Sequence, residues 1–503
     1  MNKEGHRFWN GVERIGNRLP HPVYIFIILT IAVFVISAFC GDVVFPHPNT
    51  GEEQHITNLM TKDGLVWLLQ SMVDNFITFS PLGMTLVAML GIGIAEETGL
   101  VTTVIKSSIA GAPKVLVTAV VLLVGIMGSL AGSATFVIIP PLGAMIFKGM
   151  GRHPIAGLAA GFAGVAAGLS ANLLITQTDI LLAGITQDAA QIYDPSYTVN
   201  PTVNWYFMAV STVVLTIAGT IVLEKVVEPR LGEYHIEDAE SDVHEDGLAE
   251  VTDLERSGLR WAGIATLVYL AILALTIVPE NGILRGEDGG IIESPFMSSM
   301  IPILTIFFLI AGLAYGIRIK VIKKSVDVVN MWGKSMSGLA GFIVLCFFAG
   351  QFVKAFAESN LGLYLSVKGS EFLSSSHLTG IPLIIAFIGI TMLINFVIGS
   401  ASAKWALMAP IFVPMFMKLN FSPAFTQAAF RIADSVTNSI SPLEPFMPFI
   451  IMTALKYDRK SGLGSIIATM LPLAITFAVT WTLLLVIWYI LGLPLGPGAE
   501  IFM

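Results

Sequence analysis

Two short stretches decide the fold of this chain: Gly-Ser-Ala-Thr at residues 132–135 and Gly-Ser-Ala-Ser-Ala-Lys-Trp at residues 399–405. Both consist mainly of small residues, and both interrupt sequence that is otherwise long and apolar. Prolines follow each of them, Pro140-Pro141 in the first case and Pro410 and Pro414 in the second, and proline kinks or ends a helix. Irregular backbone persists inside a membrane only where protein or a water-filled cavity satisfies its polar groups. We therefore expect both stretches to be re-entrant hairpins.

The two stretches also indicate an internal repeat. Residues 132–135 match residues 399–402 at an offset of 267. Upstream, Glu-Thr-Gly-Leu at 97–100 matches Glu-Ser-Asn-Leu at 358–361, and downstream, Ser-Ala-Asn at 170–172 matches Val-Thr-Asn at 436–438. Any one match could arise by chance in a chain rich in Ala and Gly. Three matches in the same order at nearly one offset predict a duplicated architecture.

The composition places this duplicated chain in a membrane. Of its 503 residues, 55% are hydrophobic and only 12% are charged, about half the charged share of a soluble globular protein. The net charge of -8 comes from one acidic loop between Glu228 and Arg256, so it does not indicate a nucleic-acid partner. We expect an all-α polytopic membrane protein in contact with the lipid bilayer.

Basic clusters predict how the chain crosses the membrane. The apolar run 22–40 is too long for a signal peptide and is read as an uncleaved first span. Lysines and arginines near 148–152, 318–324 and 456–460 are expected to face the cytoplasm. The N-terminus then lies in the cytoplasm and the C-terminus in the periplasm, with about nine transmembrane helices. On this rule the two copies run in opposite directions, and inverted repeats with paired broken helices are typical of alternating-access secondary transporters.

The expected organisation has five parts. They are an N-terminal scaffold and dimerisation segment at 1–80, a first inverted repeat at 81–225 with a hairpin near 128–148, an acidic cytoplasmic loop at 226–258, connecting scaffold spans at 259–330, and a second inverted repeat at 331–503 with a hairpin near 399–418.

Several motifs extend the pattern to a known family. The two hairpin motifs, the segment from Ser170-Ala171-Asn172 to Thr178-Asp179, and Phe-Arg-Ile-Ala-Asp-Ser at 430–435 resemble those of the p-aminobenzoyl-glutamate transporter (AbgT) family over nearly the whole chain. The resemblance implies a homodimer in the bacterial inner membrane, with nine spans and two hairpins per subunit. It implies transport of p-aminobenzoyl-glutamate-like folate fragments and export of sulfonamide antimetabolites, driven by a sodium or proton gradient.

The resemblance also implies which residues act. Positions that match the family's functional residues are Asp179, Ser402, Trp405, Pro423, Arg431, Asp434 and Pro442. Asn395 and Asp434 correspond to a sodium site proposed for the family. No cofactor is expected, with Na+ as one of the two candidate coupling ions and the proton as the other.

The charged residues among these stand out on their own chemistry. Asp179 lies in an apolar run, where a carboxylate is costly and therefore a functional candidate; the alternative is a helix cap at the outer interface. Arg431 and Asp434 lie three residues apart and can pair along one helix face. The pair is either structural, or Arg431 grips a substrate carboxylate with its planar fork of donors while Asp434 neutralises Arg431 or binds the driving cation.

Uncharged candidates complete the predicted site. Trp405 either anchors the chain at the membrane interface or stacks on an aminobenzoyl ring, in which case Trp405→Ala should weaken binding but leave membrane expression intact. Asn172 and Asn438 occupy equivalent positions in the two repeats and are candidate ligands of a substrate or cation. Gly157, Gly161, Gly164 and Gly168 are read as close helix packing instead.

Other functional classes fit the sequence less well. Gly-Lys-Ser at 333–335 lacks the first glycine of a phosphate-binding loop, and the histidines form no HExxH motif, so no enzyme is expected. A sodium-coupled dicarboxylate carrier is the main alternative within transport. An ion channel is a further alternative, but it would typically show a ring-forming filter.

Overall fold

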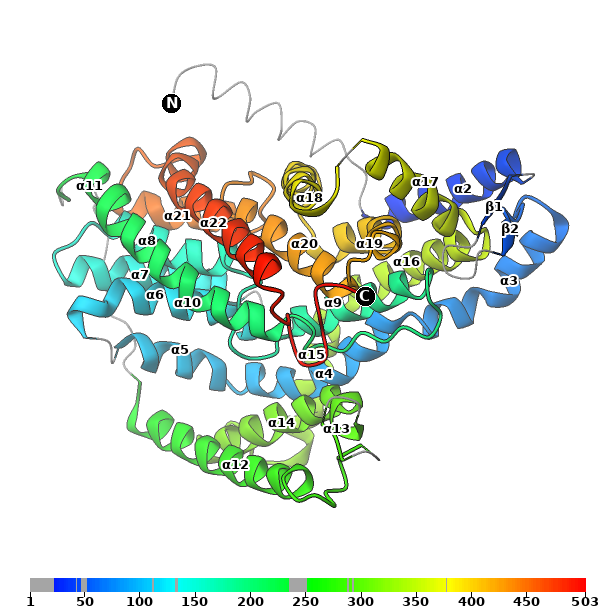
Figure 1. Cartoon of the computed structure of the whole chain (residues 1–503). Helices are drawn as coiled ribbons and strands as arrows, with labels where there is room; N and C mark the ends of the chain where they lie inside the picture. The colour runs from blue at the N-terminus through cyan, green and yellow to red at the C-terminus, as the bar shows by residue number, and fades with distance from the viewer. Residues whose placement is uncertain are drawn as a thin grey trace.

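The computed structural model describes residues 22–41, 43–46, 52–110, 113–131, 134–234, 251–286, 289–291, 294–376 and 378–503. The N-terminal residues before Pro22, most of the acidic loop and the centre of the first hairpin motif, residues 132–133, lie outside this part. The described chain is almost entirely helical, with one short antiparallel pair of strands, β1 (Val44–Pro46) and β2 (Glu53–His55). The expectation of an all-α polytopic protein is confirmed (Figure 1).

The first half of the chain forms helices that alternate between long spans and short interrupted segments. After α2 (Pro22–Cys40) and the two strands come α3 (Lys62–Ile77), α4 (Ser80–Glu97), α5 (Leu100–Ala110), η1 (Lys114–Leu116), α6 (Val117–Ile126), η2 (Met127–Ala131), α7 (Ala134–Gly149), α8 (Pro154–Phe162), η3 (Ala163–Ala167), α9 (Gln177–Ala190), α10 (Trp205–Val222), η4 (Leu223–Val227) and α11 (Glu228–Leu231).

The second half repeats this order after three connecting helices. The connection consists of α12 (Asp253–Ile277), α13 (Pro295–Ser298) and α14 (Met300–Arg318). Then follow α15 (Ser325–Gly338), α16 (Ala340–Glu358), α17 (Leu361–Ser375), α18 (Gly380–Asn395), α19 (Ala401–Lys418), α20 (Pro423–Asn438), α21 (Met447–Tyr457) and α22 (Leu463–Leu491).

Helices α15 to α22 correspond one by one to helices α3 to α10. Glu97 and Glu358 each end the second helix of their series, while Pro154 and Pro423 each begin the sixth. These prolines suit a first helical position, where no backbone donor is lost. The repeat predicted from three short matches is therefore present in the helix order. The opposite orientation of its copies in the membrane remains a prediction from the charge rule.

Length and hydropathy identify seven helices that could cross a membrane in the described part of the chain, or eight if the bent pair α17 and α18 is one span. The expected total of about nine stays a prediction. Four further apolar helices, within 117–130, 135–149, 154–167 and 447–457, are shorter than the roughly 20 residues that a span needs. The first two lie on either side of the first hairpin motif. The other two belong to the broken helices of the two repeats, which are α8 with η3 and α9 in the first repeat and α20 with α21 in the second.

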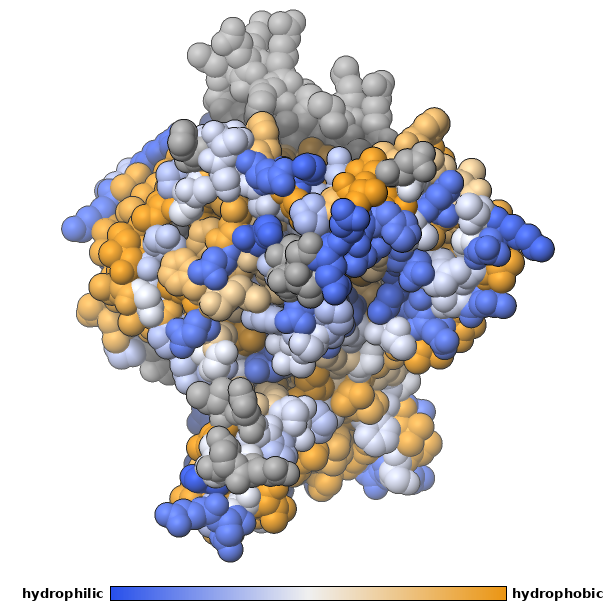
Figure 2. Space-filling view, turned by 45° about the vertical axis from the view of Figure 1, so that its right-hand side comes forward, coloured by the Kyte–Doolittle hydropathy of each residue, from blue (hydrophilic) through white to orange (hydrophobic). Residues whose placement is uncertain are grey.

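Helices α8 and α20 form the centre of the molecule. All nine residues of α8 and all sixteen residues of α20 are buried. Helix α12 is the opposite case, because only Gly258 and Ala262 are buried along its 25 residues. It projects with α14 from the rest of the chain at the bottom of Figure 1, and Figure 2 shows hydrophobic residues on this projecting part.

Close contact between glycines joins α7 to α8. A Cβ atom added to Gly157 would lie 2.1 Å from the carbonyl oxygen of Gly143, and one added to Gly143 would lie 2.3 Å from that of Gly157. Gly164 likewise lies close to α6: a Cβ atom added to it would lie 2.7 Å from the Cα atom of Gly125. The interpretation of these glycines as close-packing positions is confirmed.

Candidate functional site

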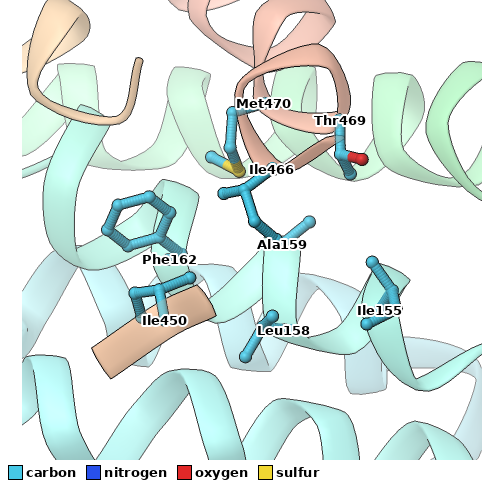
Figure 3. Close-up of a pocket in the computed structure, with 8 residues that line it drawn as sticks. All are labelled: Ile155, Leu158, Ala159, Phe162, Ile450, Ile466, Thr469 and Met470. Carbon is cyan, nitrogen blue, oxygen red and sulfur yellow. The ribbon is translucent and has the colours of Figure 1, made fainter. Parts of the chain in front are cut away.

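Each repeat contains a broken helix, and the break in the first lies against the helix that precedes the break in the second. In the first repeat, residues 168–176 separate η3 from α9, and in the second, residues 439–446 separate α20 from α21. The backbone N–H of Ser170 donates to Ser435 Oγ at 3.2 Å, so the first break lies directly against α20. Figure 3 shows further contact between the repeats: α8 faces α21 and α22 across an apolar gap lined by residues such as Leu158 and Ile466. That gap measures only about 10 Å³ and is a packing space, too small for a substrate.

Arg431 forms a buried ion pair with Asp179. Its Nη1 lies 2.6 Å from Asp179 Oδ1, and its Nη2 donates to the carbonyl oxygen of Ser170 at 2.6 Å. Both charged side chains are buried, with exposures of 0% and 1%. The pairing of Arg431 with Asp434 expected from their spacing is therefore wrong. The guanidinium extends from α20 to the first repeat, where it contacts the Asp179 carboxylate in the first turn of α9 and the Ser170 carbonyl oxygen in the break before that helix.

Asp179 has a second role at the start of α9. Its Oδ2 accepts hydrogen bonds from the backbone N–H and the hydroxyl of Thr176, both at 2.7 Å, and from Asn172 Nδ2 at 3.0 Å. A carboxylate in the first turn also suits the positive end of the helix dipole. Asp179 thus caps a helix, as the alternative interpretation held, but it does so in the protein interior and not at an outer interface.

Asp434 forms a separate buried pair with Lys404 of α19. Lys404 Nζ lies 2.7 Å from Asp434 Oδ1, with side-chain exposures of 0% and 2%. Lys404 was not among the residues singled out from the sequence, although it stands in the second hairpin motif. The rule that marked Asp179, a charge inside an apolar run, applies equally to a lysine between Ala403 and Trp405.

Asn395 and Asn438 connect this pair to its surroundings. Asn395, the last residue of α18, donates through Nδ2 to Asn438 Oδ1 at 2.8 Å, to Thr437 Oγ1 at 2.6 Å and to the carbonyl oxygen of Asp434 at 2.9 Å. Its Oδ1 accepts from Lys404 Nζ. The structure therefore brings Asn395, Asp434 and Asn438 together. Asn172 lies instead with Asp179 and Arg431, where its Oδ1 has no hydrogen-bond partner among the described residues.

Trp405 lies in the protein core. Its side chain is fully buried, its Nε1 donates to Thr186 Oγ1 at 2.9 Å, and its ring lies 4.4 Å from that of Phe430 between centroids. Complete enclosure by protein excludes the membrane-interface anchor as an account of Trp405. One face of the indole is already covered by Phe430.

The remaining predicted residues lie around these groups. Ser402 is partly exposed in the first turn of α19, where its hydroxyl lies 3.2 Å from that of Ser400. Pro423 is buried at the start of α20, and Pro442 is partly exposed in the break after it. None of these residues lines the cavity of about 600 Å³ between α5, α12 and α14.

The arrangement is an internally neutral charge centre. Two cations and two anions from α9, α19 and α20 pair within the described core, and each pair joins two different helices. Burying four charges is costly unless every one is compensated. Arg431 Nε has no hydrogen-bond partner among the described residues, so the centre retains one buried donor for a bound acceptor. No group of three or more His, Cys, Asp or Glu that could hold a metal ion occurs in the described part of the chain.

Comparison with known proteins agrees with this architecture. The model of the "AbgT putative transporter family" matches residues 7–503. The chain is 41% identical over 500 residues to the p-aminobenzoyl-glutamate transport protein of Escherichia coli K12, covering 98% of this chain and 96% of that protein.

Two solved structures are similar over nearly their full length. The YdaH transporter of Alcanivorax borkumensis, described as having an unusual topology, is 37% identical with a TM-score of 0.90, over 95% of this chain and 100% of that one. MtrF of Neisseria gonorrhoeae, described as illustrating a class of antimetabolite efflux pumps, is 43% identical with a TM-score of 0.93, over 98% and 100%. With its paired broken helices and a family match along almost its entire length, this chain belongs to the AbgT transporter family.

Proposed function

We propose that the protein is a secondary active transporter that moves p-aminobenzoyl-glutamate-like folate fragments and exports sulfonamide antimetabolites, driven by a sodium or proton gradient. The observation that carries this proposal is the buried charge centre at the meeting point of two broken helices, the place where alternating-access carriers bind their substrates. The E. coli relative, named for p-aminobenzoyl-glutamate transport, and MtrF, described as an antimetabolite efflux pump, support the substrate class.

Arg431 is the proposed carboxylate-binding residue. A guanidinium binds a carboxylate through two parallel donors, and here Asp179 holds that position at 2.6 Å. A substrate carboxylate would take over from Asp179, with Arg431 Nε and Asn172 Oδ1 as groups that still lack partners. We assign substrate contacts also to Ser402, Trp405, Pro423, Pro442 and Asn438, and ion coupling to Asn395 and Asp434.

The proposal extends to the setting of the protein. We place it as a homodimer in the bacterial inner membrane, with a cytoplasmic N-terminus and a periplasmic C-terminus. The exposed apolar residues of α12, including Leu267 and Leu275 with exposures of 67% and 72%, suit contact with lipid or with a second subunit. The five-part division at 1–80, 81–225, 226–258, 259–330 and 331–503 belongs to the same proposal.

Transport in proteoliposomes tests the function. Radiolabelled p-aminobenzoyl-glutamate and sulfamethazine are followed with imposed sodium and proton gradients, applied separately. We expect accumulation with one of the gradients, counterflow when unlabelled substrate is preloaded, and no competition by succinate. Competition by succinate would favour a dicarboxylate carrier, and flux without counterflow would favour a channel.

Variants connect the transport result to the charge centre. Arg431→Ala is expected to lose substrate affinity, and Asp434→Asn to bind substrate without gradient-driven accumulation. Lys334→Met serves as a matched control, because Lys334 is an exposed lysine that pairs with Glu97 away from the site. Unchanged substrate affinity in folded Arg431→Ala protein would exclude Arg431 as the carboxylate-binding residue.

A further inference from the structure

The position expected for a coupling cation already contains a positive charge. Asn395 and Asp434 are the two residues that the family resemblance connects with sodium. Lys404 Nζ lies 2.7 Å from Asp434 Oδ1 and donates a hydrogen bond to Asn395 Oδ1. The lysine side chain has an exposure of 0%. Its ammonium group therefore contacts one oxygen from each of the two residues.

The orientation of the Asn395 amide is fixed by its other contacts. Nδ2 donates to Asn438 Oδ1, Thr437 Oγ1 and the Asp434 carbonyl oxygen. A rotated amide would place its oxygen against the Asp434 carbonyl oxygen and its NH2 group against the Lys404 ammonium, so Oδ1 points toward Lys404. The ammonium also lies 5.9 Å from the centroid of the Phe430 ring, a distance at which a cation is attracted to the ring face. Three groups from two helices, α18 and α20, thus surround this one cation.

A sodium ion does not fit beside Lys404 at this position. The Asp434 carboxylate is the counter-charge of Lys404, and the next cation in the core, Arg431, has its own carboxylate in Asp179. A second cation would share the Asp434 carboxylate with the ammonium, and like charges repel strongly where the dielectric is low. Glu444 is a further buried carboxylate near this pair, but among the described residues only Asp434 forms an ion pair with Lys404. The residues present therefore disagree with a sodium site formed by Asn395 and Asp434 while Lys404 is in place.

We propose that Lys404 is a built-in cation that occupies the position between Asp434 and Asn395 in place of a metal ion. It is a positioning residue, because it holds the end of α18, the start of α19 and the middle of α20 together. Departure of Lys404 would free two oxygen ligands and release the second hairpin from α20. The inference deepens the proposed function, since it concerns the coupling ion of that carrier.

Sodium binding without substrate tests the inference. Purified protein in detergent is measured at constant ionic strength in sodium chloride or choline chloride, by thermal unfolding and by binding of radioactive sodium. Wild-type protein should show no difference between the salts. Lys404→Met exposes the Asp434 carboxylate to an added cation, so its melting temperature should rise with sodium concentration, since a ligand that binds only the folded state stabilises it.

Further variants sharpen the result. Lys404→Gln keeps a hydrogen-bond donor for Asp434. It provides a second variant without a lysine at position 404 if Lys404→Met does not fold. Lys404→Met/Asp434→Asn should lose the sodium effect, because it removes the carboxylate that pairs with Lys404. Glu444, a second buried carboxylate that interacts electrostatically with both residues, remains in this variant, so adding Glu444→Gln shows whether it holds any residual sodium. Lys334→Met removes a lysine that is 74% exposed and should behave as wild type.

Two outcomes would overturn the inference. One is sodium-specific stabilisation of wild-type protein that disappears in Asp434→Asn. The other is a folded Lys404→Gln or Lys404→Met protein that binds no sodium. Because no substrate is present, neither outcome bears on the transport of p-aminobenzoyl-glutamate, and a failure of that transport leaves the sodium result standing.

Discussion

Arg431 pairs with Asp179, 252 residues away in the sequence, while Asp434, one helical turn away on the same helix, pairs with Lys404. Both pairs therefore extend from α20 to other helices, the first to α9 and the second to α19. Neighbouring opposite charges on a helix stabilise it by only about 0.2–0.5 kcal/mol when exposed. Inside this core each charge instead satisfies a charge on a different helix, so the two pairs determine how α20 is held in the bundle.

The choice of partners predicts which double substitution is tolerated. Arg431→Gln and Asp179→Asn should each destabilise the fold by about 3–5 kcal/mol, because each strands a buried charge. The double variant Arg431→Gln/Asp179→Asn removes the pair as a whole and should recover much of this loss. Thermal unfolding in detergent measures the effect.

The matched double variant is Arg431→Gln/Asp434→Asn. It leaves Asp179 and Lys404 without their partners and should be the least stable of the set. Equal stability of the two double variants would contradict the observed pairing.

Substitution of Trp405 is expected to lower the stability of the fold, whatever its effect on substrate binding. Because its side chain is fully buried, Trp405→Ala should leave a cavity and cost about 3–5 kcal/mol. A loss of this size would also lower membrane expression, which the sequence-based expectation held to be intact in this variant. Trp405→Phe keeps an aromatic ring in the core but removes the hydrogen bond to Thr186 at 2.9 Å, worth about 0.5–1.5 kcal/mol, so it should destabilise the fold less than Trp405→Ala. Wild-type unfolding temperature in Trp405→Ala would show that the ring is not part of the core.

Gly157→Ala should destabilise the contact between α7 and α8. The new methyl group would lie 2.1 Å from the Gly143 carbonyl oxygen, and overpacking of this kind typically costs about 1–3 kcal/mol. Gly389→Ala in α18 is the control, because a Cβ there meets nothing within 4 Å. The control should be neutral or slightly stabilising, so the two alanine variants should differ in sign when their unfolding is compared.

Asp188 is expected to hold the start of α4. Its carboxylate accepts from the Ser80 backbone N–H at 3.1 Å and from the Ser80 hydroxyl at 2.7 Å, next to the break between α3 and α4. Asp188→Ala should cost about 0.5–2 kcal/mol, as loss of a helix cap does, and should speed hydrogen exchange in the first turn of α4. Ser80→Ala keeps the backbone bond and should show the smaller effect; a larger one would assign the cap to the hydroxyl.

Local signals in the sequence were enough for the architecture. The repeat and the close-packed glycines depend on short-range rules: proline suits the first position of a helix, small residues let helices approach closely, and a duplicated motif marks a duplicated segment. The expectation that proline ends the helix after each hairpin motif is wrong, since α7 continues through Pro140 and Pro141 and α19 through Pro410 and Pro414. Glu97 and Glu358 end equivalent helices, and each is followed by a matching short segment, Thr-Gly-Leu at 98–100 and Ser-Asn-Leu at 359–361.

Partner choice in the core could not be predicted in this way. The spacing of Arg431 and Asp434 indicates only that they share a helix face, whereas Asp179 and Lys404 reach them through tertiary packing. A count of charges would have helped, since Asp179, Lys404, Arg431 and Asp434 all lie in apolar or small-residue segments and sum to zero. Trp405 was misleading for a related reason: its small neighbours in the chain make room for a large core ring.

The complete enclosure of α20 has a consequence for how the protein is made. This helix carries Gln427, Arg431, Asp434 and Asn438, and it is absent from the helices that length and hydropathy identify as spans. Each arginine or aspartate at the centre of an inserting helix opposes insertion by about 2.5–3.5 kcal/mol. Alone, α20 would therefore stay in water during synthesis. It can enter the bilayer only together with helices such as α19 and α22, once Lys404 and Asp179 are in place to pair with its charges. The central helix of the finished protein should therefore be among the last to insert.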